Sequence, residues 1–316
     1  MIRTHEKNTL LGKRYRVLDC LAAGKAGLFY LAADEKAEEK LVTLRQLGTA
    51  HSEEISKEVA LLSALEHPSI PRVLAQFGDA DFQYVVMEPF EGATLEDLVG
   101  REGALPQERV VRCAIALCKV LEYLHSQPAP IVHRDLQPSS VFVDENTVWI
   151  GDFGLARIVA SAEKKTMIGT LGYSPREQAR GYPEPRSDLY AVGAIMAFCL
   201  TGRTPKPFAI PPMASANPAV HPLVAAVIDR AVRGEASARV PSANAMRAAL
   251  VQALAALTGQ EPEDSLERAA ETTPAGHPPP AAADEGGDKA RSRSLSWIWG
   301  ALAALLTAAA AYLMAK

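Results

Sequence analysis

The stretch that decides the fold is HRDLQPSSVFV, residues 133–143. A second stretch, VWIGDFGL, follows at residues 148–155. Each combines an apolar run typical of a β-strand with an aspartate in a short polar turn, Asp135 in the first and Asp152 in the second. Phosphoryl transfer from a nucleotide needs two such groups, because one must receive or orient a hydroxyl proton while the other holds Mg²⁺ against the phosphates.

The order of the two motifs resembles the catalytic and metal-binding loops of bacterial eukaryotic-like (Hanks-type) Ser/Thr protein kinases. H-R-D alone is a weak match, but H-R-D-L-x-P followed by D-F-G is specific, which disfavours two ordinary loop aspartates. The resemblance implies that Asp135 is the catalytic base and that Asp152 is a metal ligand. It also implies ATP and Mg²⁺ (or Mn²⁺) as cofactors.

The resemblance covers about residues 10–257 and implies an α+β fold with two lobes. A small β-rich N-lobe would span about residues 10–88, and a larger helical C-lobe about residues 89–257. The composition then changes, because residues 258–294 are rich in Pro, Gly, Ala, Glu and Asp and lack apolar periodicity. That composition is typical of a flexible cytoplasmic linker.

Residues 295–315, LSWIWGALAALLTAAAAYLMA, contain no charged side chain. At about 1.5 Å per residue, this segment can cross a hydrocarbon core of about 30 Å. Lys289, Arg291 and Arg293 precede it, which predicts a single-pass helix in the plasma (inner) membrane with the kinase domain in the cytoplasm. The alternative is an alanine-rich helix packed on protein.

The overall composition is that of a globular protein. The chain has 316 residues, 48% of them hydrophobic, and a net charge of −4, which is too close to neutral to suggest a nucleic-acid partner. The four cysteines are scattered and form no C-x-x-C pair. This pattern favours reduced thiols over a disulfide framework or a zinc site.

A glycine-rich hairpin is predicted at residues 15–32, and in kinases its tip covers the nucleotide phosphates. Of the three glycines in the kinase pattern G-x-G-x-x-G, the tip keeps the second and third, Gly24 and Gly27, but has Ala22 in place of the first. Taken alone, this stretch is explained equally well as an ordinary hairpin. The resemblance assigns nucleotide contacts, with Met87 as gatekeeper, to Gly24, Lys25, Gly27, Phe29, Thr43, Met87, Glu88, Phe90 and Phe142. Large or polar side chains at positions 29, 43 and 142 predict a crowded pocket.

Departures from the kinase pattern fall on the groups that handle phosphate charge. Arg45 stands in place of the phosphate-binding lysine, and its expected partner is Glu58 on the following helix. Gln137 replaces the catalytic-loop lysine, and Ser140 replaces the asparagine that holds the second metal ion. Lys25 could supply the missing ammonium, although a solvated turn lysine is the favoured interpretation.

The activation segment is expected to run from Asp152 to Glu177. Thr170 matches the threonine that contacts the catalytic aspartate in Ser/Thr-directed kinases. Thr166 and Ser161 are the expected phosphorylation sites, whose phosphate would pair with Arg134. A second set of matches is structural: Glu177 is expected to pair with Arg239, and Asp188 to bind the catalytic-loop backbone.

Two functional hypotheses follow. The first is a membrane-anchored Ser/Thr protein kinase that transfers the γ-phosphoryl group of ATP to proteins, or to itself, at an attenuated rate. The second is a catalytically inactive pseudokinase that acts as a signalling scaffold and docks protein partners. A homodimer is compatible with either hypothesis. The retained aspartates favour the first, and the changes at positions 45, 137 and 140 favour the second.

Overall fold

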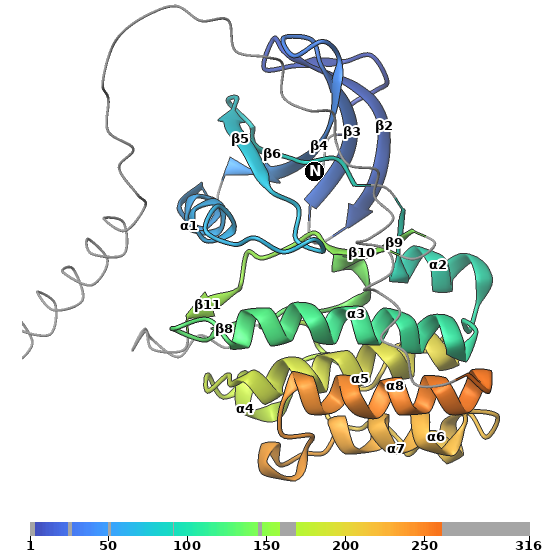
Figure 1. Ribbon diagram of the computed structural model, residues 1–316. Helices are drawn as coiled ribbons and strands as arrows, with labels where there is room; N and C mark the ends of the chain where they lie inside the picture. The colour runs from blue at the N-terminus through green and yellow to red at the C-terminus, as the bar shows by residue number, and fades with distance from the viewer. Residues whose placement is uncertain are drawn as a thin grey trace, which may run out of the picture. The chain divides into compact units, whose positions relative to one another are not determined.

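An antiparallel sheet forms the N-terminal part of the fold, as the computed structural model shows (Figure 1). The structure describes residues 4–24, 27–49, 52–90, 92–144, 147–158 and 169–260. The six strands follow the order β1-β2-β3-β4-β6-β5. Their bounds are β1 Leu10–Leu11, β2 Tyr15–Gly24, β3 Gly27–Asp34, β4 Lys40–Gly48, β5 Val73–Gly78 and β6 Phe82–Met87. Helix α1, Ser52–Leu62, lies beside this sheet.

Helices make up most of the C-terminal part, below the sheet in Figure 1. They are α2 Leu95–Glu102, α3 Gln107–His125, α4 Arg176–Ala179, α5 Pro185–Thr201, α6 Met213–Ala216, α7 Pro222–Ala231 and α8 Ala243–Thr258, with 3₁₀ turns at Pro138–Ser140 and Ala236–Ala238. Within the described residues lie five short strands, β7 Ala93–Thr94, β8 Ile131–Val132, β9 Val141–Asp144, β10 Thr147–Ile150 and β11 Arg157–Ile158, which form two small sheets with the orders β10-β9-β7 and β11-β8. Together these parts confirm the predicted two-lobed α+β fold.

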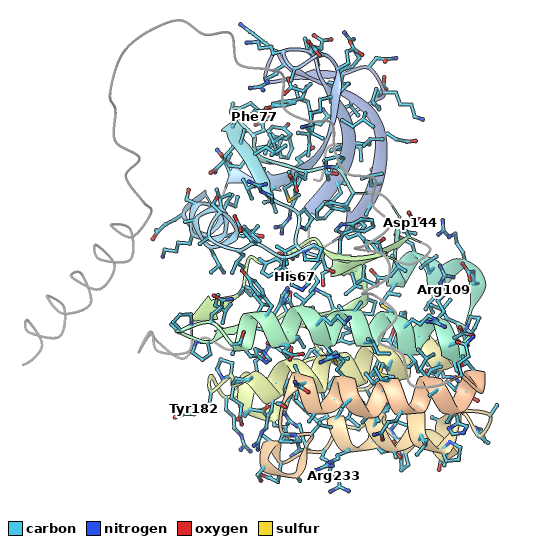
Figure 2. All side chains as sticks on the ribbon, in the orientation of Figure 1. His67, Phe77, Arg109, Asp144, Tyr182 and Arg233 are labelled. Atoms are coloured by element: carbon cyan, nitrogen blue, oxygen red, sulfur yellow. The ribbon has the colours of Figure 1, made fainter. Side chains whose placement is uncertain are left out.

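Strand alternation divides the apolar side chains of the N-lobe between two faces. On β3, Tyr30 packs into a cluster on one face of the sheet, whereas Phe29 packs into a second cluster on the other, because successive side chains of a strand point to opposite sides. The first cluster contains the stacked rings of Tyr15, Phe77 and Tyr84, with Phe77 labelled in Figure 2. The second cluster faces the C-lobe and reaches Phe142 on β9.

The core of the C-lobe is built around α3 and α5. Of the seventeen residues of α5, all from Ser187 to Leu200 are buried, which is expected of a helix that is apolar on every side. Proline at the first position of α5 and Gly202 in the left-handed conformation at its end define its limits. This cluster also includes Leu62 of α1 and Phe153, so it joins the two lobes.

A buried ion pair fixes the end of the activation segment, as the sequence indicated. Arg239, which is 1% exposed, donates to the Glu177 carboxylate from Nη1 at 2.6 Å and from Nη2 at 2.9 Å. Burial alone would raise the pKa of Glu177, but the bonds and charge of Arg239 outweigh it and the pKa is lowered. The segment is thereby held against the helical core.

The C-terminal predictions concern residues beyond this part of the structure. The chain divides into two units, Met1–Ala269 and Ala270–Lys316, and the described residues all belong to the first. Within the described ranges, no helix combines the length and the apolar character needed to span a bilayer. The linker after residue 260 and the expected membrane helix at residues 295–315 lie outside the described residues, so both stay predictions.

Candidate active site

The Asp135 turn is held by the backbone-binding carboxylate that the sequence indicated. Strand β8 leads into the turn, where the backbone N–H groups of His133 and Arg134 donate to Asp188 at 2.9 and 3.0 Å. Asp188 also forms a 2.9 Å hydrogen bond with His125 Nε2. Arg134 has φ +70°, an uncommon conformation for a residue other than glycine. Asp188 therefore stabilises the turn that presents Asp135.

Both carboxylate oxygens of Asp135 accept hydrogen bonds from side chains. Thr170 Oγ1 donates to Oδ1 at 2.9 Å, and Gln137 Nε2 donates to Oδ2 at 3.1 Å. Burial raises the pKa of Asp135, and the bond from the Thr170 hydroxyl opposes that rise. The structure thus brings together Asp135, the expected base, Thr170, its expected contact, and Gln137, which stands in place of the catalytic-loop lysine.

Arg45 joins two carboxylates that come from different parts of the chain. Its Nη1 lies 2.5 Å from Glu58 Oε1 and its Nη2 lies 2.7 Å from Asp152 Oδ1. The three side chains are only 5%, 3% and 13% exposed, respectively. Burial alone would lower the pKa of Arg45, but the charges of Asp152 and Glu58 outweigh it and raise the pKa. The Arg45 guanidinium therefore stays charged, and it neutralises part of the negative charge of Asp152, the expected metal ligand.

The same ion-pair cluster is tied to the D-F-G turn. Glu58 Oε1 also accepts a hydrogen bond from the backbone N–H of Phe153 at 2.9 Å. The Phe153 ring lies 4.8 Å from the His133 ring, and Phe153 belongs to the same buried cluster as Leu62. These contacts hold α1 close to the D-F-G turn, which is the arrangement expected from the register of Glu58.

Ser140, the second expected metal ligand, bonds within its own turn. Its Oγ donates to the carbonyl of Gln137 at 2.9 Å and accepts from the Gln137 N–H at 3.2 Å. The residue is fully buried, so its hydroxyl caps the turn. Within the described ranges, no group of three or more His, Cys, Asp or Glu side chains could hold a metal ion. The assignment of metal binding to Ser140 and Asp152 stays a prediction.

The space expected to receive adenine contains aromatic rings of the chain itself. The ring of Phe142 lies 5.0 Å from that of Phe29 and 4.9 Å from that of Phe90, measured between centroids. All three residues are at most 2% exposed, and Met87 belongs to the same cluster. Phe29 comes from the N-lobe and Phe142 from the C-lobe, so the two lobes are in direct contact here.

The hinge amide expected to bond adenine has a partner within the protein. The backbone N–H of Phe90 donates to Thr43 Oγ1 at 3.2 Å. Thr43 is buried on β4, where it pairs with Met87 of β6. The polar side chain of Thr43 was an unusual feature of the predicted pocket, but no sequence pattern indicated this hydrogen bond. With this bond and the ring contacts in place, the adenine of ATP does not fit the described arrangement.

Gly151 lies against the ring cluster at a point where the packing leaves no room for a side chain. A Cβ atom on it would lie 2.7 Å from Phe142 Cε2 and 3.2 Å from Phe29 Cζ. The residue just before D-F-G is therefore a glycine because the two rings fill the space beside it. No sequence signal indicates this contact, because Phe29 and Phe142 meet at Gly151 only in the folded chain.

The glycine-rich tip is described only in part. Gly24 and Gly27 face each other in the β2–β3 register, and Gly27 has φ +110°, which favours glycine. Lys25, Thr166 and Ser161 lie outside the described residues, so their assigned roles stay predictions.

Comparison with known proteins agrees with this geometry. The family described as "Protein kinase domain" matches residues 15–224. Among curated proteins, the serine/threonine-protein kinase PknA of Nostoc is 34% identical over 272 residues, covering 76% of this chain and 47% of the relative. Serine/threonine-protein kinase C of Synechocystis is 30% identical over 266 residues, covering 75% and 49%. PknB of Mycobacterium leprae is 32% identical over 211 residues, covering 62% and 33%.

The chain belongs to the protein kinase family, and these relatives are bacterial Ser/Thr kinases. This confirms the resemblance drawn from the H-R-D and D-F-G motifs. The chain spans between a third and a half of the length of these relatives.

Replacing Gly151 with alanine tests the packing of the ring cluster. We expect Gly151→Ala to lower the free energy of unfolding by about 1–3 kcal/mol, because the added methyl group overpacks a filled site. Gly100→Ala on α2 is the matched control, since a Cβ atom there meets nothing within 4 Å and alanine favours helix by up to about 1 kcal/mol. Urea unfolding measures both, and equal stability changes for the two variants would contradict the described packing.

Proposed function

We propose that this chain is a membrane-tethered Ser/Thr protein kinase with strongly attenuated phosphotransfer to protein substrates, itself included. The observation that carries the proposal is the placement of Asp135, whose oxygens are oriented by Thr170 and Gln137. A carboxylate fixed in this way can accept the proton of an incoming serine or threonine hydroxyl. The Ser/Thr relatives support the same substrate class.

Attenuation follows from the groups that surround the phosphate positions. Gln137 brings no positive charge beside Asp135, and the Ser140 hydroxyl is used inside its own turn. Arg45 keeps its charge, but its planar fork already binds two carboxylates. If each change costs about 2–4 kcal/mol of transition-state stabilisation, rates fall roughly 10²–10³-fold per site, although such effects rarely add.

A second candidate function is a pseudokinase that serves as a signalling scaffold. The observation that favours it is the contact between Phe29, Phe90 and Phe142, which occupies the place of adenine. In a pseudokinase of this kind, the contact between the two lobes would be made by these three rings and would not require a bound nucleotide. Such a protein would act by binding protein partners, and this binding would not require Asp135.

The membrane tether rests on the sequence of residues 295–315, which is apolar, uncharged and flanked by basic residues on its N-terminal side. In this proposal the kinase domain lies in the cytoplasm, joined to the membrane helix by the linker at residues 258–294. A single-pass anchor would concentrate copies of the chain at the membrane surface, where phosphorylation of one copy by another is favoured by proximity.

Phosphotransfer is tested with the full chain, radiolabelled ATP and Mg²⁺ or Mn²⁺. We expect slow labelling that Asp135→Asn abolishes and that Gln137→Lys combined with Ser140→Asn increases at least about tenfold. Because burial raises the pKa of Asp135, labelling should decline on acidification at a higher pH than for an ordinary aspartate. Arg112→Ala, on the exposed side of α3, is the control that should label normally.

Labelling of wild type that survives in Asp135→Asn would contradict the assignment of the base. Absence of label in wild type and in the Gln137→Lys, Ser140→Asn variant alike would reject the slow kinase and leave the scaffold.

The anchor is tested by deleting residues 295–316. We expect the full chain to sediment with membranes and the truncated chain to appear in the supernatant, because the apolar segment is the proposed attachment. Deletion of the linker residues 262–282 alone is the control and should leave the chain bound to membranes. A full chain that is already found in the supernatant would reject the anchor.

A further inference from the structure

We propose that the adenine compartment is closed in the ground state by the rings of Phe29, Phe90 and Phe142, so that nucleotide binds only after this cluster opens. This inference rests on the proposed function, because it assumes that the nucleotide site lies between the two lobes. It adds a second cause of slow phosphotransfer to the charge changes described above. That cause is the occupation of the adenine site by the chain's own rings.

The distance between Phe29 and Phe142, which the resemblance places on the two sides of adenine, is too short for a purine. Phe29 lies on β3 of the N-lobe and Phe142 on β9 of the C-lobe. An adenine stacked between two such side chains needs about 7 Å from one to the other, since each aromatic or aliphatic contact spans about 3.5 Å. The two ring centroids lie 5.0 Å apart with the planes inclined by 66°. The edge of one ring therefore meets the face of the other, and no purine fits between them.

The hinge residue Phe90 is already bound within the protein. Adenine recognition needs a free backbone donor at the edge of the site, and the N–H of Phe90 donates to Thr43 Oγ1 at 3.2 Å. The Phe90 ring turns inward, lies 4.9 Å from that of Phe142 and stacks at 6.1 Å on Trp149. Both the donor and the side chain of this hinge residue are thus engaged within the protein.

The aromatic rings also contact the ion-pair cluster of Arg45, Glu58 and Asp152. The guanidinium carbon of Arg45 lies 5.7 Å from the centre of the Phe29 ring, within the range of a cation–π contact. Gly151 leaves no Cβ atom between the rings of Phe29 and Phe142. Opening the adenine compartment therefore disturbs both the aromatic contacts and the environment of Arg45.

A closed ground state has a defined consequence for affinity. The apparent dissociation constant equals the intrinsic value divided by the open fraction, so a site that is open in about one molecule in a hundred binds about a hundredfold more weakly. Substitutions that remove the rings should raise the open fraction and tighten nucleotide binding without any new contact to the phosphates.

The experiment measures the dissociation constant of ATP with Mg²⁺ for the full chain, by competition with a fluorescent ATP analogue. We expect a value above about 1 mM for wild type and at least about tenfold tighter binding for Phe29→Val combined with Phe142→Leu. Adding Thr43→Ala should tighten binding further, because it frees the N–H of Phe90. Phe77→Leu is the matched control, since it removes a ring from the other face of the sheet and should leave ATP affinity unchanged.

Two outcomes overturn the inference: micromolar ATP binding by wild type, or a double variant that binds ATP no more tightly than Phe77→Leu does. If the double variant does not fold, the wild-type measurement and the single variant Phe29→Val decide in the same way.

The outcome is separable from that of the proposed activity. Tighter ATP binding without Asp135-dependent labelling keeps the closed compartment and rejects the kinase activity. Asp135-dependent labelling with micromolar ATP affinity in wild type keeps the activity and rejects the closed compartment.

Discussion

The interaction on which the rest of the structure depends is the double ion pair of Arg45 with Glu58 and Asp152. It joins β4, α1 and the D-F-G turn through one guanidinium that is 5% exposed. The planar fork of arginine can hold two carboxylates in fixed directions, whereas the compact ammonium of lysine binds as a point charge. Buried charges are stable only when they are paired in this way, so α1 and the D-F-G turn must stay close to β4.

The chemistry of the site follows from that constraint. Asp135 accepts hydrogen bonds from two neutral donors, Thr170 and Gln137, whereas Asp152 pairs with the cation of Arg45. Beside them, Phe29 and Phe142 pack from opposite lobes into the space where the sequence predicts adenine. These contacts between the chain's own side chains stabilise the arrangement of the two lobes whether or not the chain transfers phosphate.

The sequence predicted those parts of the site that depend on local motifs. Asp135 and Asp152 were found because each lies in a short turn with a distinctive neighbourhood, and Arg45 and Glu58 were paired because their register relative to the strand and the helix is fixed. The buried pair of Glu177 with Arg239 was predicted for the same reason, and the structure shows it.

The parts that could not be predicted depend on strands that meet only in the folded chain. Thr43 lies opposite Met87 on neighbouring strands, and this brings its hydroxyl to the N–H of Phe90. No sequence pattern shows that the Phe90 ring turns inward or that Gly151 makes room for rings from both lobes. Crowding could be inferred from the size of the side chains, but the contacts between them required the tertiary structure.

A double-mutant cycle between Arg45 and Asp152 tests the central claim most directly. The unfolding free energies of the full chain, Arg45→Met, Asp152→Ala and the double variant would be measured by denaturant unfolding. Direct ion pairing predicts a coupling energy of at least about 1.5 kcal/mol, because each single variant leaves a buried charge with fewer partners. Additivity within about 0.5 kcal/mol would show that the two side chains do not interact and would contradict the account.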